Sequence, residues 1–317
     1  MQSIAAPTVF PPDAGPFAAC AAAVGNFDGV HVGHAAIVDR LRAAAARHRV
    51  PAVVLTFDPH PASVLRPAEA PVPLTTPARR AELLLALGVD AVCVQPADAL
   101  LMALEPEAFF AGILRGRMAA ACLVEGRDFR FGARRRGDVA MLERLCAAAG
   151  VELDVVPPVV AGGEPVSSSR IRALVAAGRV AEASELLTGP YRLTGTVVVG
   201  ARRGATLGFP TANLAGIATL LPALGVYAAR VKVDGGVHAA AVHVGPNATF
   251  GETAVSVEVH LVGFRGDLYG RTLDVDFLDH VRDTRRFTSV EELKARLADD
   301  VATAVRIAAA PCPFGTT

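Results

Sequence analysis

The first 187 residues alternate short apolar runs with segments of helical periodicity, and this alternation constrains the fold more than any other feature of the chain. The apolar runs are 18–24, 52–56, 90–94, 120–125 and 152–156, and the helical segments lie near 34–48, 78–87, 106–115 and 138–149. Such alternation predicts a parallel sheet with helices on both of its faces. Ligands of these sheets bind beyond the carboxyl ends of the strands. The segments that follow each apolar run are therefore the places to look for a site.

Two of the helical segments carry residues that suit the beginning and the end of a helix. Thr76 can cap the segment that begins with Pro77, and Gly88 suits its end. Asp138 and Gly150 have the same positions around the last segment. The predicted helix boundaries therefore rest on local chemistry as well as on periodicity.

The pattern changes after residue 187. Apolar runs recur at 191–199, 226–233, 237–244, 255–262 and 272–278 with no long helix between them, which predicts an antiparallel barrel or sandwich. One last helix is expected over about 289–308, where Ser289 and Glu292 have the spacing of a capping box. We therefore expect two domains, residues 1–187 and residues 188–317.

Composition excludes several classes of protein. The chain is 52% hydrophobic, yet charged residues interrupt every long apolar stretch, and the first residues lack the basic and apolar regions of a secretory signal. The five cysteines are scattered and have apolar neighbours, which favours reduced core thiols. A net charge of zero disfavours nucleic acid or an anionic membrane as the main partner. We expect a cytoplasmic protein that binds small molecules, and self-association is left open.

The stretch "GNFDGVHVGH", residues 25–34, ends the first apolar run and begins the first helix. The N-terminus of a helix offers unpaired N–H groups and a positive dipole end, which suit a phosphate group. His31 and His34 can donate hydrogen bonds there, and Gly33 permits close approach of a ligand. No G-x-x-x-x-G-K-[ST] motif occurs, so ATP chemistry in this chain does not use a P-loop lysine.

Three further stretches of the first half have the composition of ligand loops. "TFDPHP" at 56–61 follows the second strand, and "GRDFRFG" at 126–132 follows the fourth and combines aromatic rings with arginine. "SSSRIR" at 167–172 begins a helix with hydroxyl groups and ends on Arg172, a natural bidentate phosphate ligand. Taken alone, each could also be an ordinary turn, a loop anchored in the core or a capped surface helix.

The second half contains one long glycine-rich stretch, "RRGATLGFPTANL" at 202–214. Its glycine N–H groups can surround a phosphate, and Thr211 and Asn213 offer neutral oxygen ligands for magnesium. Further on, alternation over 255–261 places Glu258 on a polar strand face. A lone glutamate on such a face is usually only solvated.

Taken together, the motifs of the first half resemble those of bacterial bifunctional riboflavin kinase/FAD synthetases, which belong to the nucleotidyltransferases with an H-x-G-H signature. The resemblance implies a Rossmann-like adenylyltransferase in which His31 and His34 act in catalysis. It implies ATP binding by Gly25, Phe27, Asp28, His31, Gly33, His34, Ser168, Ser169 and Arg172. It implies flavin binding by Asp58, Pro59, Asp128 and Phe129.

The resemblance continues through the second half and implies a small antiparallel β-barrel with flavokinase activity, ending in a helix. ATP would bind at Gly204, Gly208, Phe209, Pro210, Thr211 and Asn213, with Mg²⁺ on the last two, and Glu258 would be the catalytic residue. The whole chain would phosphorylate riboflavin to FMN and adenylylate FMN to FAD, using ATP and Mg²⁺. The family pattern differs at Ala248, at Val255 and at the "LTGPY" junction. The alternatives are a descendant with one inactive module and a flavin- or nucleotide-binding protein without turnover.

Overall fold

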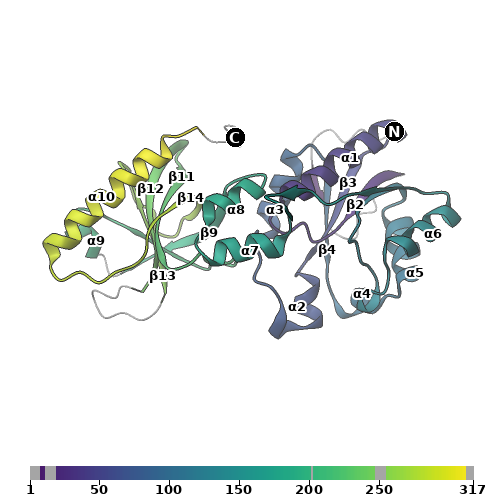
Figure 1. The fold of residues 1–317 in the computed structure, drawn as a ribbon, viewed down its shortest axis with the longest axis horizontal. Helices are drawn as coiled ribbons and strands as arrows, with labels where there is room; N and C mark the ends of the chain where they lie inside the picture. The colour runs from purple at the N-terminus through teal and green to yellow at the C-terminus, as the bar shows by residue number, and fades with distance from the viewer. Residues whose placement is uncertain (1–7, 11–18, 201–202, 247–254, 312–317) are drawn as a thin grey trace. The chain divides into compact units, whose positions relative to one another are not determined.

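The computed structural model describes residues 8–10, 19–200, 203–246 and 255–311 (Figure 1). Its contacts divide the chain into two compact units, Met1–Ser168 and Ser169–Thr317. Helix α8 (Val180–Leu186) groups with the second unit because it packs on strands β9 (Tyr191–Val198) and β14 (Thr272–Arg282). The assignment of function to residues 1–187 and 188–317 stays a prediction.

The first unit is built on a six-stranded parallel sheet in the order β1-β4-β3-β2-β5-β6. The strands are β1 (Thr8–Phe10), β2 (Cys20–Val24), β3 (Ala52–Asp58), β4 (Ala91–Pro96), β5 (Ala120–Gly126) and β6 (Glu152–Val156). The predicted fold class is confirmed. Only β1 was not expected, because three residues next to a proline pair give no periodic signal. It lies at the sheet edge, where proline is tolerated.

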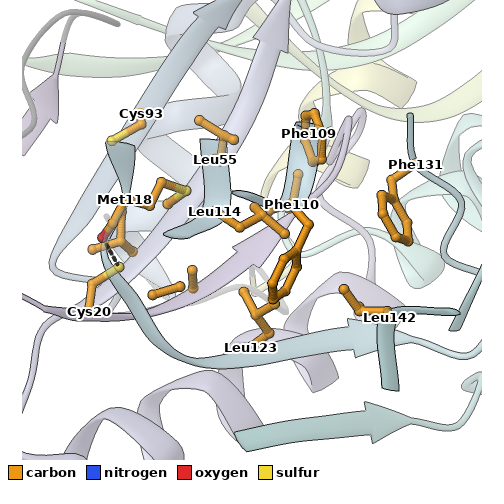
Figure 2. Packing of buried hydrophobic residues seen from close by; sticks show 14 of the residues in the cluster. Cys20, Leu55, Cys93, Phe109, Phe110, Leu114, Met118, Leu123, Phe131 and Leu142 are labelled. Atoms are coloured by element: carbon orange, nitrogen blue, oxygen red, sulfur yellow. Dashed lines mark hydrogen bonds between the residues drawn. The ribbon is translucent and has the colours of Figure 1, made fainter. Parts of the chain in front are cut away.

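Helices cover both faces of this sheet, because alternate residues of the buried strands point to opposite sides. On one face, α1 (Val32–His48) and α3 (Pro77–Ala86) pack on Ala21 and Val54. On the other, α5 (Pro106–Phe109), a π-helical turn over Phe110–Arg117 and α6 (Val139–Ala149) enclose a second core. Figure 2 shows that core, in which the Cys20 thiol donates to the Met118 carbonyl oxygen at 3.0 Å.

The predicted helix boundaries are confirmed by their caps. The hydroxyl oxygen of Thr76 accepts the N–H of Arg79 at the start of α3, and the carboxylate of Asp138 accepts the N–H of Met141 at the start of α6. Gly150 ends α6 with φ 65°, in the left-handed region that favours glycine. Helix α7 (Ser168–Ala176) begins in the stretch 167–172, where the sequence predicted the start of a helix, whereas the short helices α2 (Pro61–Leu65) and α4 (Ala99–Ala103) were not predicted.

The second unit is a closed antiparallel barrel of six strands in the order β10-β13-β12-β11-β14-β9. Besides β9 and β14 it contains β10 (Ala212–Ala215), β11 (Gly225–Val233), β12 (Gly236–Gly245) and β13 (Ser256–Leu261). The sequence did not decide between a barrel and a sandwich. Strand β10 closes the barrel, because it pairs with both β9 and β13. The four residues of β10, which lie shortly after Pro210, gave no strand signal of their own.

Helix α10 (Val290–Ala308) lies along the barrel and packs on β11, β12 and β14 (Figure 1). Its predicted cap is confirmed, since the Ser289 hydroxyl oxygen accepts the N–H of Glu292 at 3.1 Å. Asp300 on its inner face is only 1% exposed. The guanidinium of Arg282, at the end of β14, donates to Asp300 Oδ1 at 2.9 Å and Oδ2 at 2.7 Å. A two-point ion pair with a buried carboxylate thus fastens the helix to the barrel.

Asp300→Ala should lower the free energy of unfolding of the second unit by about 3–5 kcal/mol, because it leaves the Arg282 guanidinium, whose side chain is only 14% exposed, without its carboxylate. Asp299→Ala is the matched control, since that side chain is 71% exposed and should change stability by less than about 0.5 kcal/mol. Urea unfolding followed by circular dichroism measures both. Equal losses in the two variants would contradict an anchoring role for Asp300.

Four cysteines, Cys20, Cys93, Cys122 and Cys146, are buried and carry free thiols, as predicted, whereas Cys312 lies outside the described residues. Within the described ranges, no helix is long and apolar enough to span a bilayer.

Candidate active sites

The first candidate site lies where the sheet order of the first unit reverses. Strands β2, β3 and β4 follow one another toward one edge, whereas β5 pairs on the opposite side of β2. The carboxyl ends of β2 and β5 therefore flank the topological switch point, which is where open α/β sheets bind ligands. The predicted loops that begin at Gly25 and Gly126 extend from these two strand ends.

His31 and His34 cap helix α1 by exchanging hydrogen bonds. The backbone N–H of His34 donates to Nδ1 of His31 at 3.3 Å, and the N–H of His31 donates to Nδ1 of His34 at 3.2 Å. The two rings stack with their centroids 3.6 Å apart. A Cβ at Gly33 would lie 3.0 Å from the His31 ring, so glycine leaves room for the stacked pair. The H-x-G-H spacing is thus a histidine version of the capping box.

Both histidines are neutral at pH 7. Burial lowers the pKa of His31 from 6.5 to about 4, against the opposite effect of the negative charges of Asp128 and Asp28. Burial, the repulsion that a protonated His31 would exert and the positive charge of Arg80 hold the pKa of His34 well below its ordinary value. Because each Nδ1 accepts a backbone hydrogen bond, each neutral ring carries its proton on Nε2. Among the described residues no hydrogen bond uses either Nε2, so both N–H groups can donate to a ligand.

Asp28 precedes the two histidines in the same loop, and its carboxylate accepts hydrogen bonds from other residues of the protein. Its oxygens accept the N–H groups of Leu74 and Thr75 and the Thr75 hydroxyl, all at 3.0 Å, and the side chain is 1% exposed. The Thr75 hydroxyl oxygen also accepts the N–H of Gly29 at 3.1 Å. Asp28 therefore fastens the histidine loop to the segment before α3, and its contact with ATP stays a prediction.

Backbone strain marks the same loop. Phe27 has φ 47° and Val30 has φ 44°, in the left-handed region that such side chains rarely adopt. Phe27 is buried, its ring lies 5.0 Å from that of His34, and a Cβ at Gly25 would meet it at 3.2 Å. Strained residues of this kind cluster at functional sites because the surrounding packing has to hold them.

The loop after β3 reaches the same end of the sheet. Asp58, the last residue of β3, and Pro59 are exposed and joined by a cis peptide bond. His60 caps α2, and its Nε2 lies 2.9 Å from the Asn26 amide nitrogen in the histidine loop. The structure thus brings together two strand-end loops, although the flavin contacts predicted for Asp58 and Pro59 remain predictions.

The loop after β5 places Asp128 close enough to His31 to affect its pKa. Phe129 is half-buried and stacks on the buried ring of Phe131 with centroids 5.5 Å apart. Phe131 also contacts Phe109, at 6.1 Å between centroids. Core packing therefore supports Phe129. Flavin binding by Asp128 and Phe129 stays a prediction.

Of the predicted hydroxyl cluster, Ser168 lies at the first site. Its hydroxyl donates to the backbone oxygen of Asp28 at 2.8 Å. Ser169 and Arg172 belong to the second unit, so their role toward ATP stays a prediction. Sequence reasoning missed Arg80, which is 3% exposed and donates to Thr56 Oγ1 at 3.0 Å and to the Phe57 oxygen at 2.9 Å. The signal that could have revealed Arg80 was its position, as a cationic residue, on the buried face of α3.

The second candidate site begins with the glycine-rich loop before β10. The N–H of Phe209 donates to the oxygen of Gly204 at 2.8 Å, and a Cβ on Gly204 would collide with the Phe209 oxygen. Gly208 has φ 91°, which favours glycine. The Pro210 oxygen lies 2.8 Å from Nδ1 of His260 in β13. Glycine is therefore required at two points of a loop that ends beside β13.

Pairing between strands places the predicted kinase residues on one face. Glu258 in β13 lies opposite Asn213 in β10 on one side and opposite His243 in β12 on the other. The hydroxyl of Thr211 donates to Glu258 Oε2 at 3.3 Å. The structure thus brings Glu258 next to Asn213 and next to Thr211, which lies 47 positions earlier in the sequence. His243 was missed, and its cross-strand position is visible only in the register.

His243 is the ionisable neighbour of Glu258 from the adjacent strand. Burial lowers the pKa of His243, while the negative charge of Glu258 acts in the opposite direction. The imidazole of His243 is therefore less readily protonated than that of an exposed histidine. Of the departures from the family pattern, Val255 is 51% exposed before β13, and Ala248 lies outside the described residues.

The residues of the barrel site fit a magnesium ion through oxygen atoms only. Across the described ranges, no group of three histidine, cysteine, aspartate or glutamate side chains could hold a metal. Thr211 and Asn213 supply neutral oxygens next to the Glu258 carboxylate. Magnesium often binds through one or two protein oxygens and completes its shell with phosphates and water.

Comparison with known proteins matches both units. A family model described as FAD synthetase matches residues 16–170, and one described as riboflavin kinase matches residues 187–308. Curated proteins named bifunctional riboflavin kinase/FMN adenylyltransferase are similar over most of their length. The relative from Listeria monocytogenes is 35% identical over 88% of this chain and 89% of its own. The one from Pseudomonas fluorescens is 37% identical over 92% and 93%.

A crystal structure of a protein from Streptococcus pneumoniae has the same fold over nearly the whole chain. It is described as a macrolide-efflux protein, is 32% identical, and has a TM-score of 0.84, covering 94% of this chain and 98% of its own. The similarity extends to both units.

Proposed function

The chain belongs to the family of bifunctional riboflavin kinases/FMN adenylyltransferases, and on that premise we propose that it makes FMN from riboflavin and FAD from FMN. We assign adenylyl transfer to residues 1–187 and phosphorylation of riboflavin to residues 188–317. One observation supports this most: each unit assembles its own group of polar side chains, the histidine pair in one and Thr211 with Glu258 in the other. Both reactions consume ATP, which supports a cytoplasmic location.

In the first unit, a phosphate oxygen of FMN would attack the α-phosphorus of ATP, and the bond to pyrophosphate would break. Negative charge gathers on the oxygens around phosphorus during this transfer. The Nε2–H groups of His31 and His34 are held by the helix cap and need no rearrangement to donate to those oxygens. Because the rings are neutral, they stabilise charge by hydrogen bonding and lose no proton to the pyrophosphate.

In the barrel, the terminal hydroxyl of riboflavin would attack the γ-phosphorus of ATP, and the bond to ADP would break. Glu258 would accept the proton of that hydroxyl as the new bond forms. The glycine-rich loop from Gly204 to Pro210 would surround the phosphates through its N–H groups. Magnesium held by Thr211 and Asn213 would neutralise phosphate charge.

Thr211→Val tests the magnesium assignment, because valine keeps the shape and removes the oxygen. The variant should need more Mg²⁺ for half-maximal FMN formation, by about 10-fold, the scale of a weakened metal site. The Mg²⁺ requirement of FAD formation from added FMN should not change. Thr196→Val, an exposed threonine in β9, is the matched control. Equal magnesium curves for the Thr211 variant and the parent would remove Thr211 from the metal site.

A two-product assay tests the proposed function itself. Purified protein is incubated with riboflavin, ATP and Mg²⁺, and FMN, FAD and pyrophosphate are followed by chromatography over time. FMN should appear first and FAD should follow with an equal amount of pyrophosphate. Formation of FMN alone would indicate a descendant with one inactive module. Flavin binding without consumption of ATP would indicate a binding protein.

A further inference from the structure

Glu125 is a buried carboxyl group that neither proposed reaction uses. It lies next to the end of β5, is 2% exposed, and accepts the N–H of Val24 through Oε1 at 2.8 Å. Val24 is the last residue of β2. The contact therefore joins the carboxyl ends of two neighbouring strands through a side chain.

This contact replaces a hydrogen bond between the two backbones. Pairing of β2 with β5 runs from Cys20↔Ala120 to Ala22↔Leu123 and includes no later pair. On its other side β2 stays paired with β3 as far as Val24↔Leu55. A parallel ladder would offer the Val24 N–H a carbonyl oxygen of β5, and Glu125 offers a carboxyl oxygen instead. The strands can therefore separate at their ends without leaving a buried donor unpaired.

The pairing of β2 with β5 thus ends at the switch point of the sheet, and both loops of the first site begin there. The loop that leads to His31 starts directly after Val24, and the loop that carries Asp128 starts after Gly126, the residue that follows Glu125 and ends β5. The side chain of Glu125 is thus a brace between the origins of the two loops. Burial also raises the pKa of Glu125 well above its ordinary value. A neutral carboxyl group costs far less to bury than a carboxylate.

We propose that Glu125 is a positioning residue for adenylyl transfer, which holds the ends of β2 and β5 at the separation that FMN and ATP require between the two loops. The inference rests on the proposed function of the first unit. It assigns to Glu125 no contact with the reacting atoms. Its effect reaches the substrates through the loops that begin at Gly25 and Gly126.

Two substitutions in the full chain separate the hydrogen-bond acceptor from the volume of the side chain. Glu125→Gln keeps a neutral acceptor of the same size and should form FAD from FMN at nearly the parental rate. Glu125→Leu keeps the volume and removes the acceptor, so kcat/KM for FAD formation should fall by about 10-fold or more, mainly through higher KM values for FMN and ATP. FMN formation from riboflavin should not change in either variant.

Leu142→Ala is the control for lost packing, since Leu142 is fully buried in the core on one face of the same sheet (Figure 2). It should lower the melting temperature and leave the KM values unchanged. The proposal is overturned if Glu125→Leu affects stability but not KM, as the control does. It is also overturned if Glu125→Gln loses as much activity as Glu125→Leu, a comparison that remains decisive should the leucine variant fold poorly.

FMN binding, followed by quenching of flavin fluorescence, is measured on the same proteins. Weaker binding by Glu125→Leu than by Leu142→Ala supports the brace, and equal binding overturns it. The comparison of FMN binding still tests the role of Glu125 in the case where the parent binds FMN but forms no FAD. That behaviour of the parent would count against the proposed function alone.

Discussion

Glu258→Gln should lower FMN formation by roughly 10²–10⁴-fold, the usual span for loss of a general base. Glutamine preserves the size of the side chain and can still interact with the Thr211 hydroxyl, which donates to Glu258 at 3.3 Å. It cannot accept the proton of a primary alcohol, which is a poor nucleophile at neutral pH. Initial rates of FMN formation at saturating riboflavin and ATP measure the effect.

Glu291→Gln is the matched control, because Glu291 is an exposed glutamate of the same unit, and its rate should equal that of the parent. The Glu258 variant should still bind riboflavin and ATP and should form FAD from supplied FMN. Phosphorylation of riboflavin within a few-fold of the parent would exclude Glu258 as the base. Parallel loss of both activities would mean that the units are coupled more tightly than we propose.

His31→Ala and His34→Ala should each lower FAD formation from FMN by about 10²-fold or more, the scale of a lost preorganised transition-state donor. Each ring also holds the other, through the stacking and the exchanged hydrogen bonds of the cap. The double variant should therefore lose less than the product of the two single losses. Stopped assays with radiolabelled ATP measure these rates.

His48→Ala is the matched control, since His48 ends the same helix and faces Glu152 at the surface. It should leave FAD formation unchanged, and phosphorylation of riboflavin should persist in all of these variants. Nearly normal FAD formation in the double variant would remove both histidines from the mechanism.

Sequence reasoning predicted the two candidate sites from residues that lie in short, continuous motifs. The period of the apolar residues predicted the parallel sheet, and the residues after each strand predicted where ligand groups lie. The position of Thr211 beside Glu258 follows once β10 pairs with β13. Short strands such as β10 have almost no local signal, because closure of the barrel determines them.

Contacts between distant residues could not be predicted. Asp28 matched a ligand motif, yet its carboxylate binds Leu74 and Thr75, which lie 46 and 47 positions away. Glu125 read as part of an apolar strand until its contact with Val24 was known. In both cases the side chain pairs with a backbone group whose position depends on tertiary structure. A single sequence does not show which distant residues form such pairs.

Complementation between two inactive variants tests the central claim, that separate sites in one chain carry the two reactions. Glu258→Gln protein and His31→Ala/His34→Ala protein are each incubated with riboflavin, ATP and Mg²⁺, alone and mixed, and FAD is measured. Neither variant alone should accumulate FAD, whereas the mixture should, because FMN released by the histidine variant can be adenylylated by the other. A mixture that forms FMN but no more FAD than the separate variants would contradict this division of labour.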